Sequence, residues 1–126
     1  MIEAQIEVIV KAHVGLTALV GARVYPQVMP ENGKLPAIIY QVISSIPITT
    51  HDGDANLSTT LVQFNCHAAT YLASKQVAVQ LRSCFSGIAS RSNDVHSSIM
   101  KSSRDLYDAA LKARGVSMDF LFTHEN

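Results

Sequence analysis

The sequence predicts an α+β fold in which a mainly antiparallel sheet of about four strands carries two amphipathic helices packed on one face. Two observations predict it: helical spacing of apolar residues near the N-terminus and again after residue 70, and two-residue alternation in the stretches between and after them. A third is composition, because 126 residues with 48% apolar and 16% charged side chains suffice for one hydrophobic core. We therefore expect a single domain over residues 1–126.

The first helix is predicted at the N-terminus, where apolar residues recur at helical spacing from Ile2 to Val10. Gly15 should end it, and Leu16–Val20 should add a short turn before the extended segment Arg23–Pro26. Prolines, an asparagine and a glycine then predict a loop over Gln27–Pro36.

Two strands of a hairpin are predicted next. Ala37–Ser44 is rich in β-branched and aromatic residues, and Leu57–Cys66 alternates with Val62 and Phe64 on the side turned toward a core. Between them Pro47–Asn56 has no apolar periodicity, which predicts a long, exposed polar loop.

The second helix is predicted from the spacing of Ala73, Val77 and Leu81, with Thr70 capping its start and Gly87 ending it. After a small-residue loop over Ser86–Asp94, alternation predicts a weaker strand at Val95–Ser102 and a clear one at Val116–Phe122. Arg104–Arg114 between them fits either a bent strand with a turn or a short helix.

The adjacent Cys66 and His67 suggest a thiol–imidazole site at first sight. Consecutive residues of a strand point to opposite faces, so a Cys66 that faces the core leaves His67 on the other side. We interpret Cys66 as a core residue at a strand-to-helix junction, and no catalytic residue is predicted.

No metal or cofactor is predicted either. The five histidines show none of the ligand-pair spacings of metal sites, and nucleotide-binding and hydrolase motifs do not occur. Thr50–Asp54 gathers a histidine and two carboxylates but does not continue with the ligands of a calcium-binding loop, so we interpret it as a polar loop tip.

The charge balance bears on possible partners. Ten basic residues match ten acidic ones, which disfavours a dedicated nucleic-acid binder and leaves little electrostatic repulsion between copies. Two isolated cysteines fit a reduced compartment, and an acidic N-terminus without a long apolar run predicts a soluble chain made in the cytoplasm, with no membrane partner.

Four short segments follow one another in a distinctive order. They are a Gly-x-Arg-hydrophobic-Tyr-Pro element (Gly21–Pro26), a Leu-Pro-x-Ile-x-Tyr strand start (Leu35–Tyr40), a Gln-hydrophobic-Asn-Cys strand end (Gln63–Cys66), and an Arg-Asp-x-Tyr segment (Arg104–Tyr107) before a strand with aromatic residues. In this order, over nearly the whole chain, the sequence resembles the tail-completion, or tail-to-head joining, proteins of long-tailed bacteriophages.

This resemblance implies a structural virion protein, not an enzyme, that forms a ring of six copies at the head-proximal end of the tail. The ring would terminate the tail tube, as a tail terminator does, and join tail to head at the neck. Implied partners are further copies of itself, the major tail tube protein and a head connector or completion protein. DNA would pass through the ring lumen without sequence-specific contacts, and assembly would take place in the host cytoplasm.

Two loops are candidate interaction sites within such a ring. We expect the loop Thr49–Asn56 to face the tube or lumen, and the loop Gln27–Leu35 to contact an adjacent subunit; the residues concerned are Thr50, His51, Asp52, Gly53, Asp54, Met29, Glu31 and Asn32. Strand edges and the sheet face without helices are further surfaces able to pack against a neighbour. The alternatives are a head-side connector or adaptor of the neck, and a small α+β enzyme or ligand-binding domain that uses Cys66.

Overall fold

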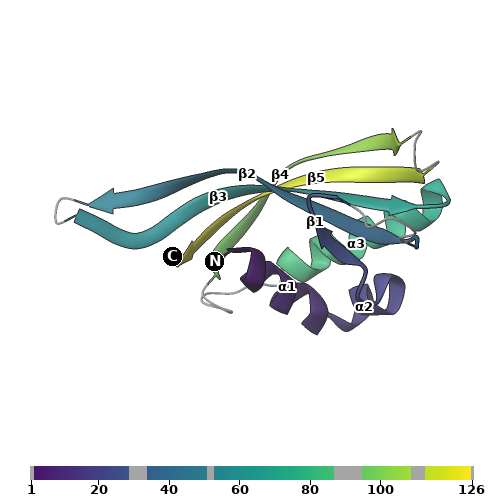
Figure 1. Cartoon of the computed structure of the whole chain (residues 1–126), viewed down its shortest axis with the longest axis horizontal. Coiled ribbons are helices and arrows are strands. Elements are labelled where there is room, and N and C mark those ends of the chain that lie inside the picture. Colours follow the sequence, from purple (N-terminus) through teal and green to yellow (C-terminus); the bar gives the residue numbers. More distant parts are fainter. Residues whose placement is uncertain (1, 29–33, 51–52, 87–94, 109–112, 126) are drawn as a thin grey trace.

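The residues that the structure describes form an α+β fold, with one five-stranded sheet and three helices along one of its faces (Figure 1). The computed structural model describes residues 2–28, 34–50, 53–86, 95–108 and 113–125. Along the chain the elements are α1 (Ile2–Ala12), α2 (Val14–Val20), β1 (Val24–Pro26), β2 (Ala37–Thr50), β3 (Gly53–Ala68), α3 (Tyr71–Ser86), β4 (Val95–Asp108) and β5 (Ala113–Glu125).

The N-terminal segment forms two helices where one helix and a turn were predicted, so the predicted number of helices is one too low. His13 adopts an extended conformation (φ −86°, ψ 108°) and separates α1 from α2. The short α2 buries Leu16 and Val20, which lie one helical turn apart on the same face. Gly21 then ends α2 with a φ of +59°, a conformation that glycine adopts without strain.

Helix α3 lies where the second helix was predicted. Thr70 accepts a hydrogen bond at its Oγ1 from the backbone N–H of Ala73 (3.2 Å), which confirms the predicted N-terminal cap. Val77 and Leu81 are fully buried, as their spacing predicted. Gly87, the predicted end of the helix, lies outside the described residues.

Among the described residues the sheet has five strands in the order β1-β2-β3-β5-β4, compatible with the about four that were predicted. The additional strand is β1, which pairs with β2 in parallel over three residues and makes the sheet mixed. The other pairings are antiparallel, as expected. A three-residue strand with a distant partner has no periodicity of its own, which explains why β1 read only as an extended segment.

The predicted loop Pro47–Asn56 is wrong for most of its length. Strand β2 continues to Thr50 and β3 begins at Gly53, so the two strands form a long hairpin that projects beyond the helices (Figure 1). We call its projecting part, Ile43–Thr50 with Gly53–Leu61, the arm. A bulge at Ile43 marks its start on β2, since Val42 pairs with Val62 but Ser44 pairs with Leu61. Pro47 is tolerated here because β1 pairs with β2 only up to Tyr40, so the arm lies at a sheet edge.

Strands β4 and β5 form a second hairpin and resolve the open segment Arg104–Arg114. Residues 104–108 complete β4 and residues 113–114 open β5, which makes the strand alternative correct for the part that the structure describes. The predicted alternation at Val116–Phe122 is confirmed, with Val116, Met118, Phe120 and Phe122 buried.

The core lies between the sheet and the helices and is centred on phenylalanines. Phe64 of β3 packs against Phe85 of α3 (centroids 5.1 Å apart), and both contact Phe120 and Phe122 of β5 at 5.1–6.2 Å. Burying each such side chain stabilises the fold by about 1.5–3 kcal/mol. Even-numbered residues of β3 from Ser58 to Ala68 face this core, as the alternation of the strand predicted.

Candidate functional site

Cys66 and His67, adjacent in sequence, face opposite sides of the sheet. Cys66 is fully buried on the helix side of β3, and burial raises the pKa of its thiol to about 12. His67 follows it on the strand and therefore faces the other side, where its ring lies over Gly115 of β5. A thiol with this pKa stays protonated at neutral pH, so the interpretation as a core residue at a strand-to-helix junction is confirmed.

Polar side chains of the described residues do not assemble a metal site either. Within those ranges no group of three or more His, Cys, Asp or Glu side chains comes together. His124 instead bonds to Thr60 (2.6 Å between Nε2 and Oγ1), and Thr60 also bonds to Ser45 (3.0 Å). This chain of polar contacts, buried at Thr60 and His124 and exposed at Ser45, joins β5, β3 and β2 at the base of the arm. The described helices also include none that is long and apolar enough to cross a membrane.

The outer face of the sheet, opposite the helices, changes character along the strands. At one end the row Leu106, Gly115, His67 and Ala37 crosses four strands, and Ala37 and His67 are buried. A β-carbon on Gly115 would lie 2.8 Å from both the Cys66 carbonyl oxygen and Leu106 Cδ1. The side chains at this end of the face are thus tightly packed.

Polar groups occupy the middle of the outer face. Asp119 of β5 accepts hydrogen bonds at its Oδ2 from Ser102 (2.9 Å) and Arg104 (3.2 Å) of β4. Arg104 and Ser102 are exposed, whereas the Asp119 side chain is only 20% exposed, so the ion pair lies at the edge of the surface.

An apolar band follows toward the arm. It consists of outer-face residues of neighbouring strands, interspersed with Ser44, Thr59 and Thr123: Ile99 of β4, Leu121 of β5, Leu57 and Leu61 of β3, and Ile46 and Ile48 of β2. Ile46 is 64% exposed and Ile99 is 54% exposed, while the others are half-buried. Apolar side chains gathered on one open face of a protein are typical of an interaction site.

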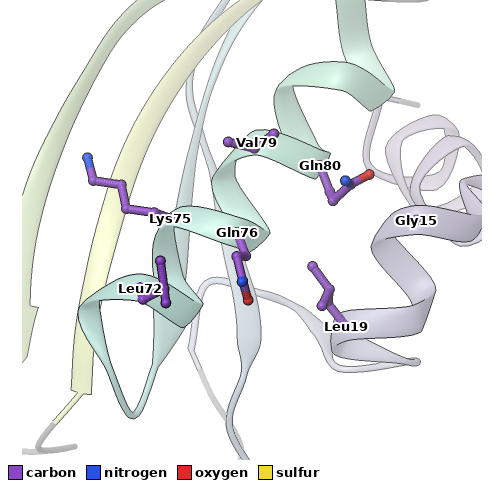
Figure 2. A pocket seen from close by; sticks show the side chains of 7 residues that line it. All are labelled: Gly15, Leu19, Leu72, Lys75, Gln76, Val79 and Gln80. Carbon is purple, nitrogen blue, oxygen red and sulfur yellow. The ribbon is translucent and has the colours of Figure 1, made fainter.

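A second uncovered apolar surface lies on the opposite side of the molecule, among the helices. A groove of about 510 Å³ separates α2 from α3 and is lined by Gly15, Leu19, Leu72, Lys75, Gln76, Val79 and Gln80 (Figure 2). Leu72 and Val79 are 68% and 62% exposed. In Figure 2 Leu19 of α2 points toward α3, and Lys75 points to the other side of α3. We call this the α2–α3 groove.

Lys75 belongs to a surface cluster that ties α3 to β4. Its ammonium group bonds to Asp105 (2.8 Å) and lies 5.1 Å from the centre of the Tyr71 ring, while the Tyr71 hydroxyl donates to the same carboxylate (3.0 Å). The hydrogen bond to Asp105 is the main cause that raises the pKa of Lys75, and the hydrogen bond from Lys75 is the main cause that lowers the pKa of Asp105.

The predicted interaction residues fall in two groups. Thr50 and Gly53 pair with each other and Asp54 pairs with Thr49 at the end of the arm, so they belong to strands and not to a loop. Five others lie outside the described residues: Met29, Glu31, Asn32, His51 and Asp52. The structure therefore brings Thr50, Gly53 and Asp54 together and leaves the segment Gln27–Leu35 untested.

Sequence reasoning missed both uncovered apolar surfaces. The isoleucines Ile43, Ile46 and Ile48 stand in the sequence beside the polar stretch, and their spacing could have indicated an apolar strand that extends past Ser44. Leu72 and Val79 lie off the helical face used to predict the core, which makes them candidates for a second contact.

Comparison with known proteins assigns this arrangement to a class, the structural proteins of phage-like virions. The family model described as "Tail completion protein gp17" matches residues 5–125. The chain belongs to this family of bacteriophage tail-completion proteins, and it is a structural tail or head–tail protein of a virion.

A solved structure shares the fold. One chain of the structure titled "Virion of native gene transfer agent (GTA) particle" superimposes with a TM-score of 0.67, covering 98% of this chain and 94% of that chain. The two sequences are 18% identical, so this likeness concerns the fold. None of the curated proteins matches the chain.

Proposed function

We propose that the protein forms a ring at the head-proximal end of the tail, where it terminates the tail tube and joins the tail to the head. Membership of the tail-completion family, over residues 5–125, is the observation that carries this proposal. In this role the protein acts by binding and has no enzymatic activity. Its partners are further copies of itself, in a ring of six, the major tail tube protein and a head connector.

The uncovered surfaces support an assembly role. A protein that works alone buries its large apolar side chains or scatters them, whereas here an apolar band and an apolar groove remain open on opposite sides. The net charge of zero leaves little repulsion to keep copies apart. A ring at this site would let DNA pass through its lumen, contacted without regard to sequence.

The end of the arm is proposed to face the tube or the lumen, through Thr50, Gly53 and Asp54 with the adjoining His51 and Asp52. The arm reaches beyond the helices (Figure 1), so its end can contact a partner that the body of the protein does not touch. The segment Gln27–Leu35, with Met29, Glu31 and Asn32, is proposed to contact an adjacent subunit.

A deletion of residues 50–55, closed by an Asn-Gly turn, tests the role of the arm. Because these residues lie at the end of the β2–β3 hairpin, the monomer should keep its thermal unfolding midpoint while heads and tails fail to join. Counting infectious particles and imaging the lysate would measure the second effect. Normal numbers of infectious particles would remove the end of the arm from the mechanism.

Imaging of a strain without the gene separates this role from that of a head-side connector. Tails that continue to grow beyond their normal length would support tube termination. Tails of normal length beside separate heads would instead favour a connector or adaptor on the head side of the neck.

A further inference from the structure

Strand β4 has an open edge on the side away from β5. It is the last strand in the sheet order and, in the part of the chain that the structure describes, it pairs with β5 alone. The strand contains no proline, and residues 101–105 are exposed. A bulge at Lys101 interrupts the pairing, after which Ser102–Asp108 pairs regularly with β5. Because the backbone groups of an open edge can pair with a further strand, Ser102–Asp108 is able to accept one.

The hydrogen bonds of the sheet show which backbone groups of β4 lie at this edge. The Ile38 N–H donates to the carbonyl oxygen of Arg23 (3.0 Å), so even-numbered residues at the start of β2 direct their backbone groups toward β1 and odd-numbered ones toward β3. Backbone groups alternate in the same way along each antiparallel strand. Following the register through β3 and β5, the N–H and C=O groups that point to the free edge of β4 are those of Ser103, Asp105 and Tyr107.

A groove of about 200 Å³ runs beside this edge, between α3 and β4, and we call it the α3–β4 groove. Val79 and Arg82 of α3 line it together with Met100 and Ser103 of β4. Its volume is below the roughly 300–1,000 Å³ of small-molecule pockets, so it suits a single side chain. Residues paired across two strands face the same side of the sheet, so a strand added to β4 would place the side chain opposite Ser103 in this groove.

We propose that the free edge of β4 and the α3–β4 groove together bind an extended segment of a different virion protein, which adds a strand to the sheet. Backbone hydrogen bonds to Ser103, Asp105 and Tyr107 supply affinity, and the side chain in the groove supplies specificity. This inference rests on the proposed role in joining tail to head and names the kind of contact that one partner makes.

The sheet of a second copy is a poor source of this strand. On the arm, Pro47 pairs with Ser58 of β3, whose backbone groups point to β5, so the nitrogen of Pro47 lies at the free edge and has no hydrogen to donate. Strand β1 spans three residues. Two β4 strands could pair with each other, but such a contact is isologous and stops at two copies, which does not build a ring. A strand of a different protein meets none of these restrictions.

Charge beside the groove favours an acidic segment. Arg82 lines the groove and Lys101 lies at the bulge of β4, and neither forms an ion pair within the described residues. Asp105, the acidic residue at this edge with a described side chain, already pairs with Lys75. The edge therefore carries an excess of positive charge, and the partner segment should combine an aliphatic residue for the groove with a neighbouring aspartate or glutamate.

Hydrogen exchange tests the added strand without any substitution. The N–H groups of Ser103 and Asp105 should exchange at least tenfold more slowly in purified particles than in the free protein, whereas that of Arg104 bonds to β5 and should be protected in both. Unchanged exchange at Ser103 and Asp105, in particles that contain the protein, would overturn the added strand and leave the proposed function standing. Particles whose head–tail junction lacks the protein would overturn the proposed function as well.

A proline in the edge tests the same backbone groups through assembly. Ser103→Pro removes one N–H from the free edge and no hydrogen bond to β5, so the thermal unfolding midpoint should be kept while infectious particles fall at least tenfold. Ser103→Ala retains the N–H and should give at least tenfold more infectious particles than Ser103→Pro. Equal numbers from the two variants would contradict the proposal. If Ser103→Pro lowers the midpoint, Tyr107→Pro makes the same test farther along the strand.

Cross-linking identifies the protein that supplies the strand. The thiols of Cys66 and Cys84 are buried, so Lys101→Cys can be labelled in purified particles with a photoreactive maleimide and irradiated. We expect a product with a different virion protein, joined through a segment that contains an acidic residue, and at least tenfold less of it from Lys11→Cys on α1. A product of two copies of this chain would instead assign the edge to a contact between subunits and contradict the proposal.

Discussion

Strand β2 begins in the part of the sheet that the helices cover, which we call the body, and ends in the arm. The isoleucines of β2 differ strongly in exposure between these two regions. Ile38 is fully buried and Ile39 is 8% exposed, whereas Ile43 and Ile46 are 49% and 64% exposed. The backbone pairing with β3 continues through both regions with two irregularities. Hydrogen bonding between the strands is therefore sufficient to continue the hairpin. Side-chain burial is what distinguishes the two regions: the body stabilises the fold, and the arm is available for assembly.

Replacing an isoleucine by alanine should change the free energy of unfolding much more in the body than in the arm, and this is the largest effect that we expect. Ile38→Ala removes buried methyl and methylene groups and should lower the free energy of unfolding by about 2–5 kcal/mol, whereas Ile46→Ala should change it by less than about 0.5 kcal/mol. Urea unfolding of the free protein measures both values. Equal losses would mean that the arm contributes to the stability of the monomer as the body does.

A substitution on the outer face of the body tests whether tight packing extends to both sides of the sheet there. Gly115→Ala would bring a β-carbon to 2.8 Å from the Cys66 carbonyl oxygen, and backbone cannot move aside as a flexible side chain can. We expect a loss of about 1–3 kcal/mol in thermal or urea unfolding. A variant as stable as the parent chain would show that the outer face of the body is as open as that of the arm.

The junction between the regions can be weakened through Thr60. Thr60→Val keeps the shape of the side chain but removes the oxygen that contacts His124 and Ser45, which should cost about 1–2 kcal/mol. Thr60→Ser restores the hydroxyl and should recover most of that difference. If serine recovers nothing, the methyl group and not the hydrogen bonds stabilises the base of the arm.

The smallest expected effect is the pH dependence that Cys66 contributes in the body. The thiol has an ordinary pKa of 9.0 when exposed, and burial raises its pKa to about 12, so above pH 9 the unfolded chain loses this proton while the folded chain keeps it. The folded state should therefore lose roughly 1 kcal/mol of stability between pH 9 and pH 10. Cys84 and Tyr40, whose pKa values burial also raises, act in the same direction.

Comparing Cys66→Ala with the parent chain isolates this contribution. The substitution lowers stability at every pH because it leaves a cavity, but it should reduce the slope of stability against pH between 9 and 11. An unchanged slope would mean that Cys66 titrates in the folded protein as it does when exposed, contrary to its burial.

Sequence periodicity predicted the body of the protein because burial there imposes a pattern on the residues. The alternation around Val62 and Phe64 and the capping of α3 by Thr70 follow from contacts with one core, and the strand-to-helix junction after Cys66 follows from the same alternation. Residues 47–50 and 53–56 of the arm were not predicted as strands, because backbone pairing holds them together and their sequence shows no apolar alternation. Its polar end was accordingly interpreted as a loop.

The role of Thr50, Gly53 and Asp54 in an interaction stays a prediction. The sequence placed these residues in a loop, whereas they are paired in strands at the end of the arm. The apolar band could not be assigned before the register was known, because its members come from four strands that lie far apart in sequence. The α2–α3 groove likewise depends on how α2, itself not predicted as a helix, packs beside α3.

The bulge at Ile43 determines which side chains the arm presents. Before it, the even-numbered residues Ile38, Tyr40 and Val42 face the helices; after it, the odd-numbered Ser45 and Pro47 do, and Ile46 and Ile48 face outward. The gain or loss of a single codon at this point would therefore turn every later side chain of β2 to the opposite face, although the composition of the arm would hardly change. A single inserted or deleted residue at this bulge would thus change which side chains the arm offers for assembly.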